Sequence, residues 1–95
     1  MRQYGHMRRV HVIISGRVQG VGFRYHTRQK AERLGLVGWV RDSADGTVEV
    51  EAEGVDDSLR ELLAWLNKGP AGAHVRDVDV TDIDPTGGTD FDVRF

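Results

Sequence analysis

The chain has 95 residues, of which 39% are hydrophobic and 29% charged, and this fits one ordinary globular domain. It contains no cysteine, so disulfides, thiolate catalysis and cysteine metal sites are excluded. Its 13 basic and 15 acidic residues give a net charge of −2, which argues against a general nucleic-acid binder. No apolar run approaches the roughly 20 residues that span a bilayer, and with no signal peptide a cytoplasmic location is expected.

The beginning of the chain shows no hydrophobic pattern. We therefore expect residues 1–8 to be a disordered or added lead, and residues 9–95 to form a single domain. The domain's basic residues gather in its first half and its aspartates near its end. A locally positive site on a mildly acidic protein suits a small anionic ligand better than a long polyanion.

The first patterned segment predicts a strand, a loop and a helix. Val10–Ser15 is apolar and largely β-branched, which is typical of a buried strand. The segment 16–22 holds three glycines in seven residues and is predicted to be a loop. An amphipathic helix follows, with Gly35 as its stop and with its apolar face at Phe23, Thr27, Ala31 and Leu34.

A hairpin is predicted next. Leu36–Arg41 forms one strand, Asp45-Gly46 the turn, and Thr47–Glu53 the returning strand. The returning strand alternates valine or alanine with glutamate, so we expect its acidic side, Glu49, Glu51 and Glu53, to be solvated.

The second half predicts another helix and two further strands. Leucines at 59, 62, 63 and 66 form a helical stripe, which Asp56 or Asp57 is expected to cap and Gly69-Pro70 to end. One further strand contains Val75, Val78 and Val80. After a loop at 85–88, a short final strand alternates Phe91, Val93 and Phe95.

The order of these elements is β-α-β-β-α-β plus a short C-terminal strand. It predicts an α+β, ferredoxin-like α/β sandwich in which two helices cover one face of an antiparallel sheet. Many activities use this fold, so the fold alone does not indicate the function.

The segment 16–24 carries the chemistry. A glycine-rich loop between a strand and a helix can turn several backbone N–H groups inward, and the helix start adds partial positive charge. Arg24, in the first helical turn, offers a planar fork suited to phosphate oxygens. These features predict a site for a compact tetrahedral anion, although glycines after a strand and a solvated arginine would be the ordinary alternative. The segment lacks the Gly-Lys-Ser/Thr of a P-loop and the third glycine of a dinucleotide fingerprint.

The same segment resembles the acylphosphatase signature at almost every position. The resemblance extends over residues 9–95, and it is densest before residue 54. It continues through Ala31-Glu32-Arg33-Leu34-Gly35-Leu36, Gly38-Trp39-Val40-Arg41, Asp45-Gly46-Thr47-Val48-Glu49 and Gly69-Pro70.

The resemblance implies hydrolysis of the carboxyl–phosphate bond of small-molecule acyl phosphates, without a metal or organic cofactor. A monomer is the default expectation, and neither a nucleic-acid partner nor a membrane is expected. The family's phosphate-binding arginine falls on Arg24, and the family asparagine that holds the attacking water falls on Asp42. The family's phosphate-cradling backbone falls on Arg17, Val18, Gln19, Gly20, Val21 and Gly22.

Asp42 is the departure from this pattern. Asparagine is neutral and offers a donor and an acceptor, whereas an ionised aspartate only accepts and would face a phosphate dianion. We therefore expect weaker activity than an asparagine would give, unless Asp42 is protonated near the phosphate. In the empty site Asp42 is expected to pair with Arg24 or Arg41, or else it is only a turn residue.

Other candidates are weaker. His6, His11, His26 and His74 lack zinc-ligand spacing, so no metal site is expected. A catalytically weak or inactive anion-binding module is the main alternative function, and Asp42 supports it. An RNA-binding ferredoxin-like domain would carry aromatic residues on central strands, where none is predicted. A role as the first domain of a larger maturation enzyme is not expected, because the chain ends after one domain.

Overall fold

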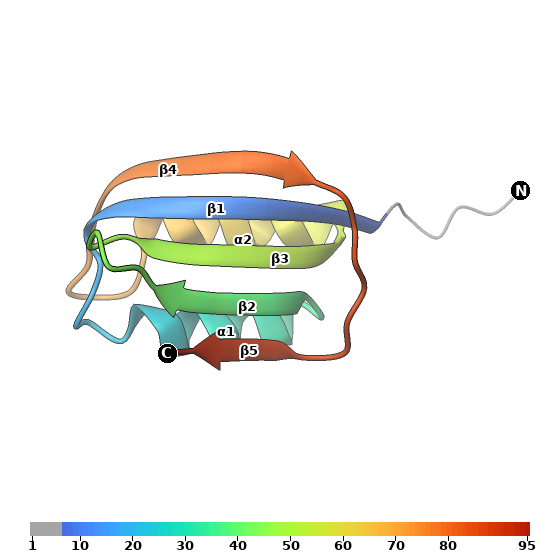
Figure 1. Ribbon diagram of the computed structural model, residues 1–95, viewed down its shortest axis with the longest axis horizontal. Helices are drawn as coiled ribbons and strands as arrows, with labels where there is room; N and C mark the ends of the chain where they lie inside the picture. The colour runs from blue at the N-terminus through green and yellow to red at the C-terminus, as the bar shows by residue number, and fades with distance from the viewer. Residues whose placement is uncertain (1–6) are drawn as a thin grey trace, which may run out of the picture.

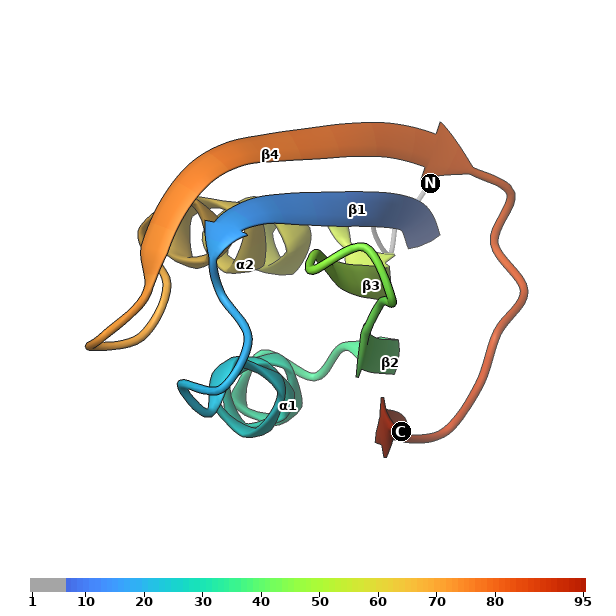
Figure 2. The same cartoon turned by 60° about the vertical axis from the view of Figure 1, so that its left-hand side comes forward.

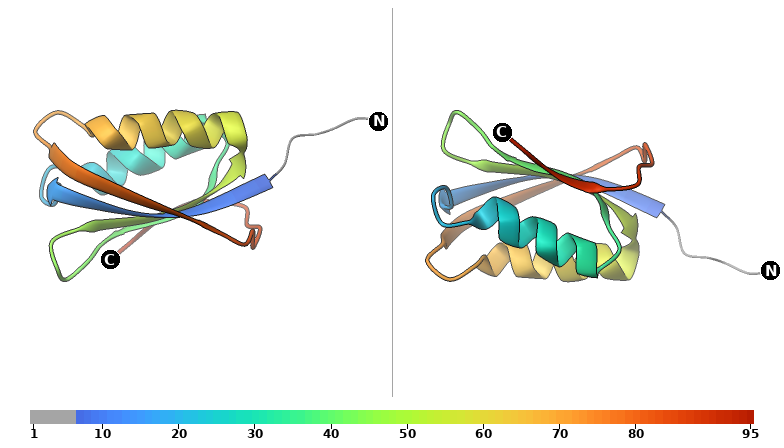
Figure 3. Two further views of the ribbon diagram at one scale, coloured as in Figure 1. Left: turned by 90° about the horizontal axis from the view of Figure 1, so that it is seen from above. Right: turned by 90° about the horizontal axis from the view of Figure 1, so that it is seen from below.

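Residues 7–95 are described by the computed structural model. The elements are β1 (Met7–Arg17), α1 (Phe23–Arg33), β2 (Val37–Asp42), β3 (Val48–Val55), α2 (Asp56–Lys68), β4 (His74–Ile83) and β5 (Phe91–Arg94). The strands form one sheet in the order β4-β1-β3-β2-β5. Figure 1 looks onto this sheet with the helices behind it, and Figure 3 shows both helices on the same face. The predicted ferredoxin-like sandwich is thus confirmed.

The sheet is mixed, so the prediction of a wholly antiparallel sheet is wrong at one edge. β1 runs antiparallel to β3 and β4, and β2 runs antiparallel to β3. β5, however, pairs with β2 in parallel. The reason is the connection after β4, which crosses the end of the sheet and returns the chain at the opposite edge (Figure 1).

β1 is longer than predicted at both ends. It begins at Met7, so residues 7 and 8 belong to the strand and not to a lead, whereas residues 1–6 lie outside the described residues. It continues to Arg17 because the pairing with β4 shifts between Ser15 and Gly16. Gly16 has a φ of 127°, and a Cβ there would lie 2.2 Å from the carbonyl oxygen of His74. Only glycine permits this close approach.

The helix-facing side of the sheet forms the core. Alternate side chains of β1 and β3 are fully buried, as the period of two in their sequences predicts. They pack against α1 and α2, whose leucine stripe is buried as predicted. The main members of the core are Val10, Val12, Ile14, Val40, Val48, Val50, Phe23, Ala31, Leu59, Leu62 and Leu66.

The start of α2 differs in detail from its prediction. Val55 occupies the capping position, and Asp56 and Asp57 lie in the first turn instead. Their negative charge there still complements the helix dipole. Asp56 also pairs with Arg8 at 2.7 Å, and this contact is the main cause of its lowered pKa.

The acidic side of β3 is not simply solvated, contrary to the prediction. The carboxylate of Glu53 is buried beside the equally buried guanidinium of Arg9, 3.1 Å away. It also accepts hydrogen bonds from the backbone N–H groups of Thr86, at 2.8 Å, and Gly87. Burial acts to raise the pKa of Glu53, but these donors outweigh burial and hold it below its usual value. Glu53 thus fastens the β4–β5 connection over the sheet.

No helix within residues 7–95 is long and apolar enough to cross a membrane.

Candidate active site

Three segments meet at one end of the sheet. They are the loop from β1 to α1, the hairpin from β2 to β3, and the end of β5. Figure 2 turns this end toward the viewer, with the loop entering α1 and the hairpin above it. The sequence separation of these segments is large, so only the fold brings their residues together.

The β1–α1 loop has the conformation that an anion-binding nest requires. It bends through residues 19–22, and Gly20 and Gly22 adopt the left-handed region with φ of 76° and 75°. Val18 is buried and anchors the loop in the core. Within residues 7–95, the backbone N–H groups of residues 18–25 reach no protein acceptor. Consecutive N–H groups with no internal partner, at a helix start, form a ready binding surface for an oxyanion.

Arg17 does not belong to this loop. It is the exposed last residue of β1 and pairs with His74 of β4. The bend of the loop therefore begins after Arg17, and the cradle over residues 17–22 stays a prediction.

Arg24 lies in the first turn of α1, as predicted, and its side chain is 24% exposed. Its Nε lies 3.5 Å from Oδ2 of Asp42. Its guanidinium carbon lies over the ring of Phe95, 4.7 Å from the centroid, and 5.9 Å from the centroid of Tyr25. One cation thus contacts one carboxylate and two aromatic rings.

Asp42 is the last residue of β2 and not a residue of the turn. It lies opposite Val48, two positions after the buried Val40, so it shares the helix-facing side of the sheet. This orientation brings its carboxylate to Arg24. The turn is built by Asp45, whose carboxylate accepts hydrogen bonds from the hydroxyl and backbone N–H of Thr47. Those bonds hold the pKa of Asp45 below its usual value.

Gln19 has a role that the sequence did not indicate. Its side-chain amide donates one hydrogen bond to the carbonyl of Ser43, at 2.8 Å, and another to that of Thr47, at 2.9 Å. These two carbonyls flank the hairpin turn. The side chain of Gln19 therefore links the loop to the hairpin that carries Asp42. Only the backbone N–H group of Gln19 is left to bind a ligand.

Phe95 was predicted as a strand residue and not as a site residue. It follows β5 in the alternation of the buried Phe91 and the half-buried Val93, and its ring reaches Arg24. This alternation indicates which side of the sheet Phe95 faces. No signal in the sequence showed that β5 would lie beside β2.

The histidines do not form a metal site in the described part of the chain. His11 pairs with Glu49 on the sheet's outer face. His26 is exposed, and its Nδ1 donates to the carbonyl of Gly22 at 2.8 Å, which closes the first turn of α1. His26 therefore stabilises the N-terminal end of α1, next to the loop.

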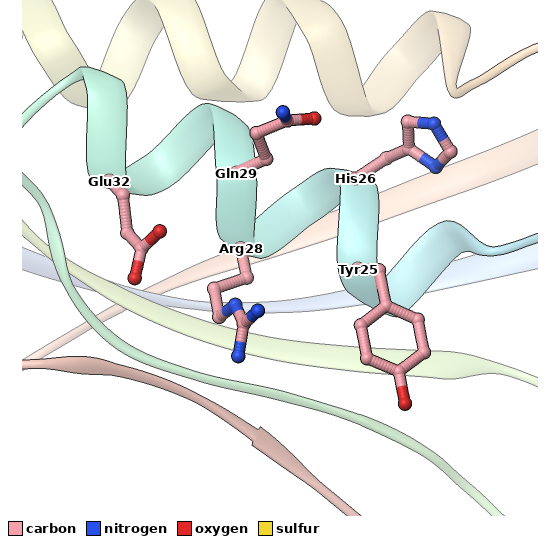
Figure 4. A pocket seen from close by; sticks show the side chains of 5 residues that line it. All are labelled: Tyr25, His26, Arg28, Gln29 and Glu32. Atoms are coloured by element: carbon pink, nitrogen blue, oxygen red, sulfur yellow. The ribbon is translucent and has the colours of Figure 1, made fainter.

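The surface of α1 also has an open hollow of about 330 Å³, which shares Tyr25 with the groups around Arg24 but includes neither Arg24 nor Asp42. Its lining side chains fan out to both sides of the helix and do not converge on a point (Figure 4). The hollow is lined by Tyr25, His26, Arg28, Gln29 and Glu32.

The open face of the sheet does not support base stacking. The central strands β1 and β3 present residues such as His11, Ile13, Glu49 and Glu51 there; the one ring in this group, the imidazole of His11, is paired with Glu49, and the glutamates make the face acidic. The guanidinium groups of Arg41 and Arg94 both lie over the ring of Trp39, on β2, at 5.5 and 4.6 Å from its centroid.

Comparison with known proteins points to one family. The family model described as Acylphosphatase matches residues 10–93. An acylphosphatase of Trichormus variabilis is 50% identical over 86 residues, which are 90% of this chain and 85% of the relative. The structure of an acylphosphatase from Coxiella burnetii superposes with a TM-score of 0.90 at 44% identity, covering 93% of each chain. The crystal structure of acylphosphatase from Bacillus subtilis gives a TM-score of 0.88 at 34% identity, covering 95% of this chain and 100% of the other.

Proposed function

The chain belongs to the acylphosphatase family, and from this premise we propose that Arg24 and the backbone of residues 18–22 carry out its reaction. The enzyme is an acylphosphatase that acts on small-molecule acyl phosphates. The observation that supports the assignment of residues is the joint presence of the unpartnered loop N–H groups and one partly buried guanidinium.

The loop and Arg24 bind the phosphoryl group. The N–H groups of residues 18–22 donate to its oxygens, and the start of α1 adds favourable potential. The guanidinium of Arg24 donates to further oxygens and stabilises the charge that they carry in the transition state. Both groups are held by secondary structure, so little reorganisation accompanies binding.

The reaction itself asks little proton chemistry of the protein. A water attacks phosphorus, the bond from phosphorus to the acyl oxygen breaks, and the substrate leaves as a carboxylate. The proton from the water passes to the phosphoryl oxygens, so the second product is inorganic phosphate. The carboxylate is a good leaving group, and catalysis rests on positioning and on charge stabilisation.

Asp42 holds the water at the position of the family asparagine, at a cost. Its carboxylate already lies 3.5 Å from Arg24, where it competes with the incoming phosphoryl group. Once substrate is bound, its charge opposes that of the phosphate. Asp42 therefore lowers the affinity of the site for anions without preventing the reaction.

Substitution of Arg24 tests this assignment. Arg24→Ala is expected to lower kcat/KM for acetyl phosphate at least a thousandfold, in keeping with loss of a principal transition-state contact. Arg24→Lys should restore only part of the activity, because lysine lacks the planar fork. Arg28→Ala, an exposed arginine on the same helix, is the matched control and should retain activity.

Retention of activity in Arg24→Ala would reject the assigned site. Binding of inorganic phosphate, measured by calorimetry on wild type and Arg24→Ala, distinguishes the enzyme from its main alternative when it is compared with hydrolysis by wild type. An anion-binding module would bind phosphate through Arg24 yet hydrolyse no acyl phosphate, and the Arg24–Asp42 pair is the observation that favours it. We further propose a cytoplasmic monomer without a cofactor, which gel filtration and activity in the presence of a chelator would test.

A further inference from the structure

The arginine at the centre of the site is bordered by exposed aromatic surface. The large hydrophobic side chains that are exposed within residues 7–95 include only two aromatic ones, Tyr25 at 50% and Phe95 at 90%. Both contact the same guanidinium, that of Arg24. Exposed apolar surface is ordinary when it is scattered, but here it is gathered at the reactive cation.

The fold explains why the two rings meet. Tyr25 follows Arg24 in the first turn of α1. Phe95 follows β5 on the helix-facing side, and the parallel pairing of Arg41 with Arg94 sets Phe95 level with Asp42. The guanidinium carbon lies over the face of the Phe95 ring, which leaves its N–H groups, in the plane of the fork, for anions.

The position of the phosphoryl group fixes where the rest of the substrate lies. A single bridging oxygen separates phosphorus from the acyl carbon, so the acyl group begins beside the guanidinium that holds the phosphate. The rings of Phe95 and Tyr25 lie against this same guanidinium and are largely open to solvent. An apolar acyl group would cover ring surface that water now covers, which is favourable.

Charge narrows the class of acyl group further. Asp42 is the carboxylate at the site, and Arg24 is already engaged by the phosphoryl group. An acyl group with its own carboxylate would face Asp42 while the guanidinium of Arg24 is engaged by the phosphoryl group. An uncharged acyl group meets no such opposition.

We propose that Phe95 and Tyr25 form an aromatic rim that binds the acyl group and selects uncharged aromatic or other apolar acyl phosphates. The proposal rests on the proposed function, because it takes Arg24 to hold the phosphoryl group. The rim acts on substrate choice, whereas Arg24 and the loop act on the phosphate that all these substrates share.

The test compares benzoyl phosphate with acetyl phosphate, which differ in their acyl groups alone. Wild type is expected to favour benzoyl phosphate in kcat/KM. In Phe95→Ala the value for benzoyl phosphate should fall about fivefold, the worth of one aromatic contact, while that for acetyl phosphate changes less than about twofold. Tyr25→Ala should act in the same direction, and Phe95→Tyr should keep the preference.

The controls separate recognition from support of Arg24. Trp39→Ala removes a ring that lies over Arg94 at 4.6 Å on the opposite side of the sheet, so it should not alter the ratio of the two substrates. Inhibition by inorganic phosphate should be the same in Phe95→Ala as in wild type. An equal fall for both substrates with weaker phosphate inhibition would show that the ring only orients Arg24, and it would overturn the proposal. So would an unchanged ratio in both alanine variants. Continued hydrolysis of acetyl phosphate by wild type, and its loss in Arg24→Ala, would leave the proposed function intact in either case.

Discussion

Replacement of Asp42 by asparagine should make the enzyme bind anions more tightly. The two side chains are nearly equal in shape, so Asp42→Asn changes the charge and the hydrogen-bonding groups while it leaves the fold in place. It removes the ion pair with Arg24, and it also removes the like charge that faces the phosphate. Both effects favour the substrate and the phosphate product.

The geometry gives the magnitude. Opposite unit charges 3.5 Å apart attract by about 1.2 kcal/mol at a dielectric constant of about 80, and by about 4.7 kcal/mol at about 20. The two side chains are 24% and 29% exposed, and solvent screening favours the lower figure, about 1 kcal/mol. Repulsion between Asp42 and bound phosphate adds about 1 kcal/mol. The sum of about 2 kcal/mol corresponds to about thirtyfold in affinity.

The assay is inhibition by inorganic phosphate, together with kcat/KM for acetyl phosphate at pH 7. The inhibition constant of Asp42→Asn should be about thirtyfold lower than that of wild type, and kcat/KM should be higher by a similar factor. High salt should narrow the gap, because the charges are partly exposed. Asp79→Asn, on the distant edge strand β4, is the charge-matched control. Equal inhibition constants in wild type and Asp42→Asn would refute the reasoning, and a lower kcat/KM in the variant would mean that the carboxylate takes part in catalysis.

Three further substitutions probe the supports of the site. Gln19→Ala removes two hydrogen bonds between the loop and the hairpin. We expect kcat to fall about tenfold and the free energy of unfolding to fall by about 2 kcal/mol. An unchanged kcat would show that this link does not matter for catalysis. Glu53→Gln should lower the free energy of unfolding by about 3 kcal/mol in urea at neutral pH. Because the folded pKa of Glu53 is lowered from 4.5, its contribution is present above that pH and is lost as pH falls through the folded value, so the difference between the two proteins should shrink in acid; a constant difference would contradict this. Gly16→Ala should destabilise the fold by more than about 2 kcal/mol, since its Cβ would lie 2.2 Å from the carbonyl oxygen of His74, and normal stability by thermal unfolding would disprove the close approach.

Local patterns were sufficient for most of the fold. The period of two in β1 and β3 and the leucine stripe of α2 each specify a buried face, and the structure buries those faces. The direction of β5 could not be predicted, because it depends on how the β4–β5 connection crosses the sheet. The prediction that Glu53 is solvated failed for the same reason. Alternation predicts which side of the sheet a residue faces, but not that residues 86 and 87 will cover it.

The candidate site likewise combines residues whose arrangement the sequence predicts with residues whose contacts depend on the fold. The loop glycines and Arg24 lie close together in the chain, so their arrangement could be predicted from the sequence. Gln19 and Phe95 act on segments far away in the sequence, and their roles depend on contacts that only the folded sheet creates. The partner of Asp42 was narrowed to two arginines. The register of β2 decides for Arg24, because Asp42 faces the helices, whereas Arg41 faces the other way and bonds Glu49 at 2.6 Å.

The Arg24–Asp42 pair also bears on which step limits turnover. On the proposed assignment, Asp42 opposes every anion at Arg24, so it weakens the binding of substrate and of the phosphate product together. Binding that changes equally in the ground state and the transition state alters KM and leaves kcat unchanged. If release of phosphate limits turnover, tighter binding in Asp42→Asn would lower kcat even as kcat/KM rises. A carboxylate at this position therefore trades efficiency at low substrate concentration for resistance to product inhibition, and a comparison of kcat between wild type and Asp42→Asn distinguishes the two regimes, because kcat falls in the variant only where release of phosphate limits turnover.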